Sequence, residues 1–302
     1  MIDAKKLYNE QLTEWNDFRE RVLQLDQIEL KKFNFGNHTI FTQFNPAREV
    51  SSNAKLDAKS IANRKCFLCE ENRPTVQRGV AFSKDFTVCV NPFPILKGHL
   101  TIISNKHQPQ AILPVIADFI SFTKELPDFT LLYNGPASGA SAPDHLHFQA
   151  VFKGQLPFET EEDKVSKKML SESKANGKTV FENGKMELWQ NYGRTMIHIE
   201  SESAKLAQSY FEQVYKQYQM LNGNDEEPKL NLFGMYENGI YHLFVFPRKK
   251  HRPDCFFAEG DNYRMVSPGA IDIAGILVLP RRKDFDEIDR NEIESIYKEV
   301  TL

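Results

Sequence analysis

Residues 142–152 read APDHLHFQAVF, and the spacing of their polar side chains decides how we interpret the fold. His145, His147 and Gln149 stand two residues apart among apolar neighbours. Alternate side chains of a β-strand share one face of a sheet. The stretch therefore predicts a strand that packs its apolar side chains into a core and presents the two imidazoles and the carboxamide in a row on its other face.

A loop of small residues, NGPASGASAPD at 134–144, precedes this predicted strand. Glycine lets backbone N–H groups approach phosphate oxygens closely, and serine hydroxyls add further donors. A neutral imidazole, whose usual pKa is about 6.5, can attack phosphorus and hold a nucleotidyl group covalently. The pattern therefore indicates phosphate chemistry at a histidine. The alternative is a partly exposed strand whose outer face is polar without any catalytic role.

Composition excludes several classes of protein. The chain has 302 residues and a net charge of -3, which gives no basic field for nucleic acid or an anionic membrane. It has no apolar run of about 18 residues, and its first residues are polar, so we expect no transmembrane helix and no secretory signal. We expect a cytoplasmic protein of two domains, or one duplicated domain, without nucleic-acid or membrane partners.

Apolar periodicity and turn signals predict both helices and strands. The expected helices cover residues 4–26, 111–126 and 203–221. The expected strands cover 30–44 with a Gly-Asn turn inside, 85–91, 99–104, 129–134, 145–152, 185–190, 194–201, and a hairpin at 230–250. Residues 45–55 read as a polar loop. Residues 159–180 are charged and lack aromatic side chains, so they read as a mobile insertion at a domain boundary.

The two halves of the chain repeat the same order of predicted elements, which indicates an internal duplication. The closing strands can be aligned, DHLHFQAVF at 144–152 with YHLFVFPRK at 241–249. His242 then corresponds to His145, and Phe244 to His147. Phenylalanine cannot attack phosphorus or bind a metal, so the second copy is expected to have lost the chemistry of the first.

The sequence also resembles a known family. HLHFQ after a loop of glycine and serine, with PFPILKGHLTIISNKH at 92–107, resembles the histidine-triad (HIT) superfamily. More narrowly, it is similar to the H-x-H-x-Q branch of galactose-1-phosphate uridylyltransferases, dinucleoside-polyphosphate phosphorylases and GDP-hexose phosphorylases. VSPGAIDIAGILVLPRRKDF at 266–285 resembles the second half of the same phosphorylases. The resemblance covers most of the chain and does not select one member of the branch.

The resemblance implies an α+β fold of two HIT-like halves, each an antiparallel sheet with helices. We expect residues 1–160 to form the catalytic half, with an N-terminal helix and a zinc site. We expect residues 161–302 to form the degenerate second half. Related enzymes also imply a homodimer.

The resemblance further implies roles for individual residues. His147 matches the nucleophile of the branch, and Gln149 matches the residue that holds the transferred phosphate. Asn91 matches a position near the nucleotide ribose, although an asparagine before Pro92 can equally be a turn residue. The other implied substrate-binding residues are Asn134, Ser138, Gly139 and Ser141 in the small-residue loop, and Arg48 in NPAR.

Cys66 and Cys69 form a C-x-x-C pair, which supplies two of the four ligands of a tetrahedral zinc site. The uridylyltransferases of the branch add a histidine after the GH strand and the first histidine of the H-x-H. Carried over, these are His107 and His145. The resemblance therefore implies structural zinc, and the alternative is a reduced cysteine pair without metal.

The expected function is nucleotidyl transfer through a nucleotidyl-His147 intermediate. The donor would be a nucleoside-diphosphate sugar or a dinucleoside polyphosphate. With inorganic phosphate as acceptor, the protein would be a phosphorylase. With a sugar phosphate as acceptor, it would be a hexose-1-phosphate nucleotidylyltransferase. A third interpretation is a non-catalytic, zinc-stabilised nucleotide-binding protein.

Overall fold

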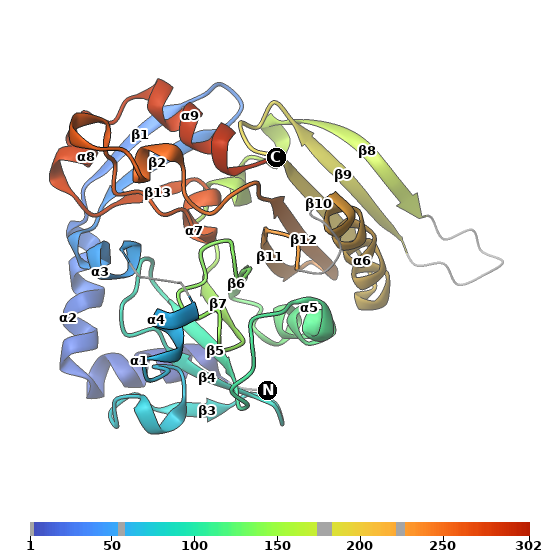
Figure 1. The fold of residues 1–302 in the computed structure, drawn as a ribbon. Coiled ribbons are helices and arrows are strands. Elements are labelled where there is room, and N and C mark those ends of the chain that lie inside the picture. The colour runs from blue at the N-terminus through green and yellow to red at the C-terminus, as the bar shows by residue number, and fades with distance from the viewer. Residues whose placement is uncertain (1–2, 54–57, 174–182, 222–226) are drawn as a thin grey trace.

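A ten-stranded antiparallel sheet runs through the centre of the molecule (Figure 1). The computed structural model describes residues 3–53, 58–173, 183–221 and 227–302. The sheet order is β3-β4-β5-β7-β6-β11-β12-β10-β9-β8. The first half of the chain supplies β3 (Gly79–Ala81), β4 (Phe86–Val90), β5 (Leu100–Ser104), β6 (Phe129–Asn134) and β7 (His147–Phe152). The second half supplies β8 (Ser166–Ser173), β9 (Gly184–Gln190), β10 (Met196–Ser201), β11 (Leu230–Glu237) and β12 (Ile240–Pro247).

The strand order supports the predicted duplication. In each half, the five strands lie in the spatial order first, second, third, fifth and fourth. The two fourth strands, β6 and β11, pair with each other at the centre of the sheet. β12 pairs with β11, as the hairpin prediction requires, and Asn238 and Gly239 at its turn have positive φ.

Helices cover one face of the sheet. They are α1 (Ala4–Glu14), α2 (Asn16–Gln24), α5 (Ile116–Glu125) and α6 (Ala204–Leu221). Each of α5 and α6 follows the third strand of its half, and the two helices contact each other (Figure 1). The helix predicted over residues 4–26 is interrupted at Trp15, whose extended backbone separates α1 from α2.

The C-terminal segment covers the opposite face. It contains α7 (Ala270–Ile273), β13 (Ile276–Leu279), α8 (Arg282–Glu287) and α9 (Arg290–Val300). β13 pairs in parallel with β2 (Thr39–Phe44), which pairs with β1 (Leu30–Asn34), so residues from both ends of the chain form a small second sheet. This pairing crosses the boundary that we predicted at residue 160.

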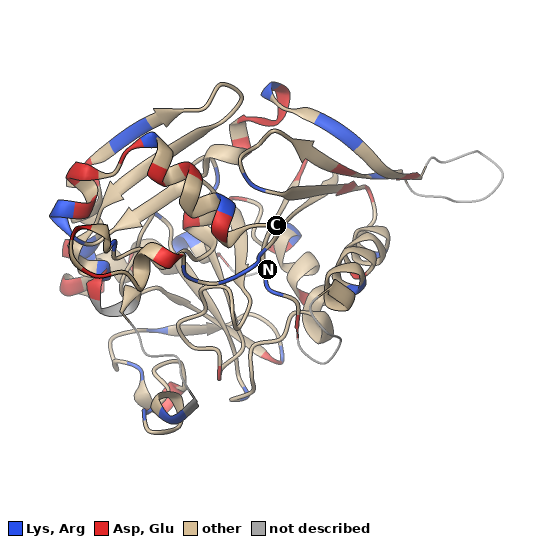
Figure 2. Cartoon of the chain, turned by 45° about the horizontal axis from the view of Figure 1, so that its top comes forward, with Lys and Arg blue, Asp and Glu red and all other residues tan. Residues whose placement is uncertain are grey.

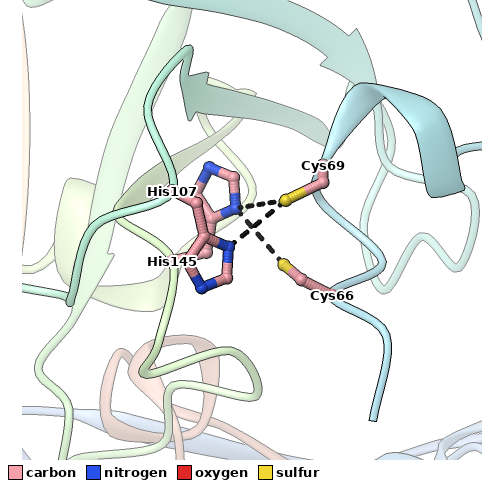
Figure 3. A group of neighbouring side chains, drawn as sticks. All are labelled: Cys66, Cys69, His107 and His145. Atoms are coloured by element: carbon pink, nitrogen blue, oxygen red, sulfur yellow. Dashed lines mark hydrogen bonds between the residues drawn. The ribbon is translucent and has the colours of Figure 1, made fainter. Parts of the chain in front are cut away.

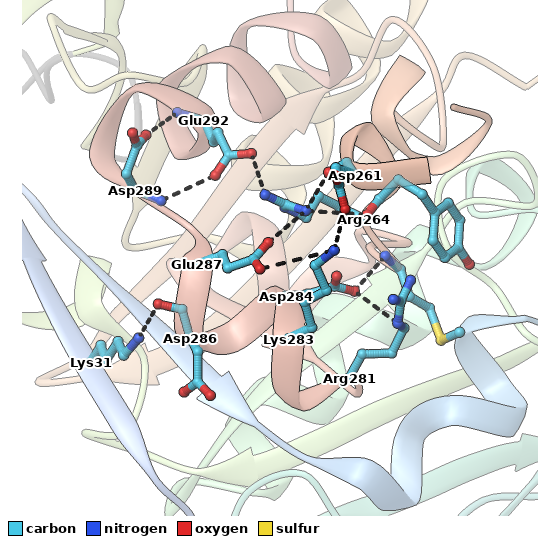
Figure 4. A network of polar contacts seen from close by, with 12 residues as sticks. Lys31, Asp261, Arg264, Arg281, Lys283, Asp284, Asp286, Glu287, Asp289 and Glu292 are labelled. Atoms are coloured by element: carbon cyan, nitrogen blue, oxygen red, sulfur yellow. Dashed lines mark hydrogen bonds and ion pairs between the residues drawn. The ribbon is translucent and has the colours of Figure 1, made fainter. Parts of the chain in front are cut away.

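Ion pairs and hydrogen bonds fix the C-terminal helices to one another (Figure 4). The buried Arg264 lies 3.4 Å from Glu287 and 3.1 Å from Glu292. The Asp284 carboxylate accepts a hydrogen bond from the backbone N–H of Met265 at 2.8 Å. A buried guanidinium is tolerated when carboxylates balance its charge, so Arg264 serves the packing of this segment.

Two local predictions are wrong. Residues 45–55 are partly helical, because η2 (Pro46–Arg48) and α3 (Glu49–Ser52) form there, and α4 (Ala58–Ala62) follows. The charged segment 159–180 begins with η5 (Pro157–Thr160) and η6 (Glu162–Lys164) and continues as β8. Its remainder, 174–180, lies outside the described residues. Several charged side chains of this segment lie on β8, which is an edge strand of the sheet. Charged residues, especially lysines, hinder an edge strand from pairing with another sheet.

Positions of Lys and Arg and positions of Asp and Glu are interspersed along the described chain, most visibly on the C-terminal helices (Figure 2). This agrees with the small net charge of -3. Within the described ranges, every helix is too short or too polar to span a bilayer.

Candidate active site and metal centre

His147 is the first residue of β7 and is 4% exposed. Its Nδ1 lies 2.8 Å from the carbonyl oxygen of His145. A carbonyl can only accept, so Nδ1 carries the proton and Nε2 keeps its lone pair. Burial lowers the pKa of the His147 imidazole to about 4, against the opposing effect of that hydrogen bond. The ring is therefore neutral at pH 7, which is the form that attacks phosphorus.

The predicted row of polar side chains needs two corrections. β7 begins at His147, so His145 lies in the bend before the strand and not in the row. The face that carries His147 is also buried, because the C-terminal segment packs on it; Val151 on that face is 0% exposed. The alternation of one strand showed which side chains share a face but not what covers that face.

His99 orients the amide of Gln149. The Nδ1 atom of His99 accepts a hydrogen bond from the backbone N–H of Ile95 at 3.2 Å, so the ring proton is on Nε2. That Nε2–H group donates to Gln149 Oε1 at 2.8 Å. With Oε1 held by His99, the Nε2 group of Gln149 is available as a donor on the face of His147.

Gln110 holds the start of β7 and was missed by the sequence analysis. It is 3% exposed, and its Nε2 donates to the carbonyl oxygens of Asn134 at 3.0 Å and His147 at 2.9 Å. Its Oε1 accepts from the N–H of His147 at 2.9 Å. A single glutamine in a loop carries no periodic signal, so its role depends on contacts that only the fold creates.

The small-residue loop lies against the second half of the chain. Gly139 has φ +99°, and a Cβ atom there would lie 2.5 Å from the Cα of Gly269. The hydroxyl of Ser138 is buried and has no hydrogen-bond partner among the described residues. Ser141 is half-buried. Buried hydroxyls are nearly always bonded, so Ser138 Oγ is a candidate donor to a ligand.

We expect Gly139→Ala to destabilise the protein more than Gly36→Ala does. Both glycines have positive φ, but a Cβ at Gly36 meets nothing within 4 Å. Gly36→Ala should therefore cost about 1–2 kcal/mol for the backbone alone. Gly139→Ala should add about 1–3 kcal/mol of steric overlap with Gly269. Denaturant unfolding of the two variants checks this; equal losses would mean that the two backbones are not in close contact.

Asn91 and Arg48 both lie near His99. Asn91 Nδ2 is 3.3 Å from His99 Nε2, and Asn91 Oδ1 accepts from the N–H of Phe93 at 3.0 Å. The hydrogen bond from Phe93 N–H is the contact expected if Asn91 is a turn residue, the alternative to a position near the ribose. Burial is the main cause that lowers the pKa of His99 to about 4; the hydrogen bond with Gln149 opposes it, and the Arg48 charge adds to it. Arg48 is thus close to the row.

A cavity of about 310 Å³ reaches Arg48 from the surface. Ligand pockets commonly measure about 300–1,000 Å³. The guanidinium of Arg21 lies 4.5 Å from the centroid of the Phe93 ring at its wall. The lining combines rings, amides and guanidinium groups, among them Arg21, Gln24, Phe44, Asn45, Arg48 and Phe93. The sequence analysis did not identify this cavity.

Four predicted metal ligands meet in one cluster (Figure 3). Cys66 Sγ lies 3.2 Å from His145 Nδ1, and Cys69 Sγ lies 3.2 Å from His107 Nδ1 and 3.6 Å from His145 Nδ1. All four ligand atoms lie within 4.8 Å of one another. Zinc bonds of about 2.3 Å to sulfur and about 2.0 Å to nitrogen place tetrahedral ligands roughly 3.5 Å apart. The residues therefore fit a Cys₂His₂ site.

The outer contacts of His145 also fit metal binding. Its Nε2 lies 2.8 Å from the carbonyl oxygen of Ser104, so Nε2 carries the proton and Nδ1 faces the cysteines with its lone pair. Metal-bound histidines usually donate their second nitrogen in this way. His145 thus connects the C-x-x-C segment to His147, because its own carbonyl oxygen accepts from His147 Nδ1–H.

Two family models match parts of the chain. Residues 7–152 match a family model described as a domain of unknown function, DUF4922. Residues 174–302 match the model of the GDPGP1-like C-terminal domain. No curated protein sequence matches the chain.

Solved structures extend the resemblance to the whole chain. The yeast Ap4A phosphorylase Apa2 aligns with a TM-score of 0.58 and 14% identity, over 95% of this chain and 96% of that one. The same protein in complex with Ap4A aligns with a TM-score of 0.56 and 12% identity, over 96% and 97%. At such identities the likeness concerns the fold. It confirms the predicted α+β, HIT-like architecture.

Proposed function

We propose that the protein is a phosphorylase that transfers a nucleotidyl group through a covalent nucleotidyl-His147 intermediate. Its substrates would be nucleoside-diphosphate sugars or dinucleoside polyphosphates, and its acceptor inorganic phosphate. The observation that carries the proposal is the state of His147, a neutral ring whose Nδ1–H is bonded to the His145 carbonyl oxygen and whose Nε2 makes no hydrogen bond to the described residues. Gln149 lies on the same face of β7 as His147, and the small-residue loop precedes this strand. The GDPGP1-like match and the phosphorylase fold support the same assignment.

The first step would be attack of His147 Nε2 on the α-phosphorus of the nucleotide. A P–N bond forms and the P–O bond to the leaving group breaks, which releases hexose 1-phosphate or a nucleoside triphosphate. As the ring acquires positive charge, the carbonyl oxygen of His145 stabilises its Nδ1–H. Gln149 Nε2 and the Ser138 hydroxyl would donate to the phosphate oxygens.

The second step would be attack of a phosphate oxygen on the same phosphorus. The P–O bond forms, the P–N bond breaks, and a nucleoside diphosphate leaves, so that His147 is again neutral. Electrons balance because each step exchanges one bond to phosphorus for another. A sugar phosphate in place of phosphate would make the protein a nucleotidylyltransferase, and the same residues would serve it.

The cavity beside Arg48 is the proposed nucleoside subsite. Its rings can stack on a base, and its amides offer donors and acceptors for the edge of that base. Arg48 lines this cavity, and Asn91 and Gln149 both lie within 3.3 Å of His99 Nε2, so these residues would meet the ribose and its phosphates.

We propose structural zinc at Cys66, Cys69, His107 and His145. Bound there, the metal would supply a rigid tetrahedral crosslink. It would hold His145 and therefore the carbonyl oxygen that fixes the tautomer of His147. The reaction at phosphorus would be carried out by His147, while Gln149 and the small-residue loop would bind the phosphate.

A substrate panel tests the proposed function. Ap4A, ADP-glucose, GDP-glucose and UDP-glucose are each incubated with the protein, with and without inorganic phosphate, and products are separated by chromatography. We expect a nucleoside diphosphate to form from at least one donor only when phosphate is present. A further arm replaces inorganic phosphate with galactose 1-phosphate. Formation of a nucleoside-diphosphate galactose there, without nucleoside diphosphate in the phosphate arm, would favour the nucleotidylyltransferase. Binding of nucleotides without any turnover would favour the non-catalytic interpretation.

A further inference from the structure

Asn231 links the second half of the chain to the phosphate loop of the first. It lies on β11, opposite Asn134 at the end of β6, where the two halves of the sheet meet. Its Nδ2 donates to Asn134 Oδ1 at 2.9 Å and to the carbonyl oxygen of Ser138 at 2.8 Å. Asn231 is 0% exposed, so both contacts are shielded from water. One side chain therefore holds two points of the loop.

Arg248 holds Asn231 in place. The Arg248 Nη1 atom donates to Asn231 Oδ1 at 2.6 Å, which orients the Asn231 amide with its Nδ2 group toward the loop. Arg248 is fully buried, and each of its three nitrogens makes at least one hydrogen bond. The remaining acceptors are the carbonyl oxygens of Val300, Pro268, Lys250 and His251. A guanidinium bonded in this way has one geometry available to it.

The second half of the chain also orients the amide of Asn134. Its Oδ1 accepts a second hydrogen bond, from the backbone N–H of Ala270 at 2.7 Å. Two donors engage that oxygen, while Asn134 Nδ2 makes no hydrogen bond to the described residues. The β6–β7 pairing ends at Leu132 opposite Gln149. Side chains two residues apart in a strand share a face, so Asn134 lies on the face of Leu132 and His147 on that of Gln149. The Gln110 amide bridges the carbonyl oxygens of Asn134 and His147, which keeps the two residues close on this face.

We propose that Asn231 is a positioning residue for nucleotidyl transfer, through which the second half fixes Asn134 with Nδ2 turned toward His147. This rests on the proposed function. Asn134 Nδ2 then donates to a phosphate oxygen at the reacting phosphorus. The opposite amide orientation would place Oδ1 there and repel the phosphate. The second half thus takes part in the reaction of the first, although its own equivalent of His147 is Phe244.

Asn231→Asp tests the proposal with minimal change of shape. The aspartate keeps the acceptor for Arg248 and gains an ion pair with it, but it loses the donor to the loop. Its second oxygen faces Asn134 Oδ1, which favours a reversed Asn134 amide. We expect kcat/KM for the most active donor of the panel to fall about 100-fold, as when one preorganised donor is removed. The unfolding midpoint is measured beside the rate, because the variant loses two buried hydrogen bonds and gains one ion pair.

The matched control is Asn37→Asp. Asn37 Nδ2 donates to the carbonyl oxygen of Asn191 at 2.9 Å, in turns away from the phosphate loop, so the same chemical change removes a similar bond. Activity of this control should stay within about twofold of wild type. If Asn231→Asp does not fold, Asn231→Ser replaces it; serine is smaller and too short to reach Asn134, and the same loss is expected.

A double-mutant cycle separates positioning from general support. Asn134→Ala lowers kcat/KM by itself, because it removes the proposed donor. If Asn231 acts through Asn134, adding Asn231→Asp to Asn134→Ala should cost less than about threefold more. A full 100-fold further loss in that background would overturn the proposal, since Asn231 would then act independently of the amide.

The outcomes also distinguish this inference from the proposed function. If the wild-type protein turns over a donor and Asn231→Asp has the same kcat/KM for it, the positioning role is overturned and the proposed function is not. A wild-type protein that neither turns over the panel nor binds ADP, GDP or UDP in calorimetry would overturn the proposed function and this inference with it.

Discussion

His147→Ala is expected to reduce nucleotidyl transfer by roughly 10⁴-fold or more, because it removes the only bond-forming atom that we assign to the first step. The variant should still bind nucleoside diphosphates, since the cavity near Arg48 and the small-residue loop are intact. The unfolding free energy of the variant should fall by no more than about 1–3 kcal/mol, as is typical when a buried side chain is truncated. Initial rates and calorimetric binding, measured on the same preparations, check both parts.

His242→Ala is the matched control for this experiment. Phe244 occupies the position of His147 in the second half, so the control uses the neighbouring His242, the equivalent of His145, whose Nδ1 lies 3.1 Å from His198 Nε2. If the second copy has lost its chemistry, His242→Ala should keep the rate within a few-fold of wild type. A collapse of activity in this variant, with His147→Ala still active, would show that we assigned the chemistry to the wrong half.

Removing a zinc ligand is expected to cost the protein much of its stability. The free energy of binding structural zinc is free energy of folding. Cys66→Ser should therefore lower the unfolding free energy by about 3 kcal/mol or more, which corresponds to a fall in midpoint of at least about 5 °C. Metal analysis should find one zinc per wild-type chain and clearly less in the variant.

Cys255→Ser provides the control for the zinc experiment. Cys255 is a half-buried free cysteine that takes no part in the cluster of Figure 3. Its replacement should leave the metal content unchanged and the midpoint within a few degrees. Wild-type protein purified without chelators and found free of stoichiometric metal would refute the zinc proposal, whatever the midpoints of the variants.

Short-range spacing predicted which side chains of the candidate site share a strand face. H-x-H-x-Q places His147 and Gln149 on one face of a strand, and this is how β7 presents them. The four metal ligands were named from a resemblance, and their side chains do meet. The alternation could not show that His145 precedes the strand, because a strand's first residue is set by its pairing partners.

Long-range contacts account for what the sequence did not predict. Nothing in the local pattern of 276–279 indicates that β13 pairs with β2, more than 230 residues earlier, and so helps to cover the face of His147. Gln110, Asn231 and Arg248 are single polar residues without a motif. Their roles follow from backbone groups that become neighbours only when the sheet is complete.

Trapping the covalent intermediate tests the central claim most directly. The protein is mixed with its most active donor in the absence of phosphate, quenched within seconds, and analysed by intact-mass spectrometry followed by peptide mapping. We predict the added mass of one nucleotidyl group per chain, located on the peptide that contains His147, lost in His147→Ala and discharged when phosphate is added. An adduct that maps to another residue, or turnover that proceeds in His147→Ala, would contradict the account.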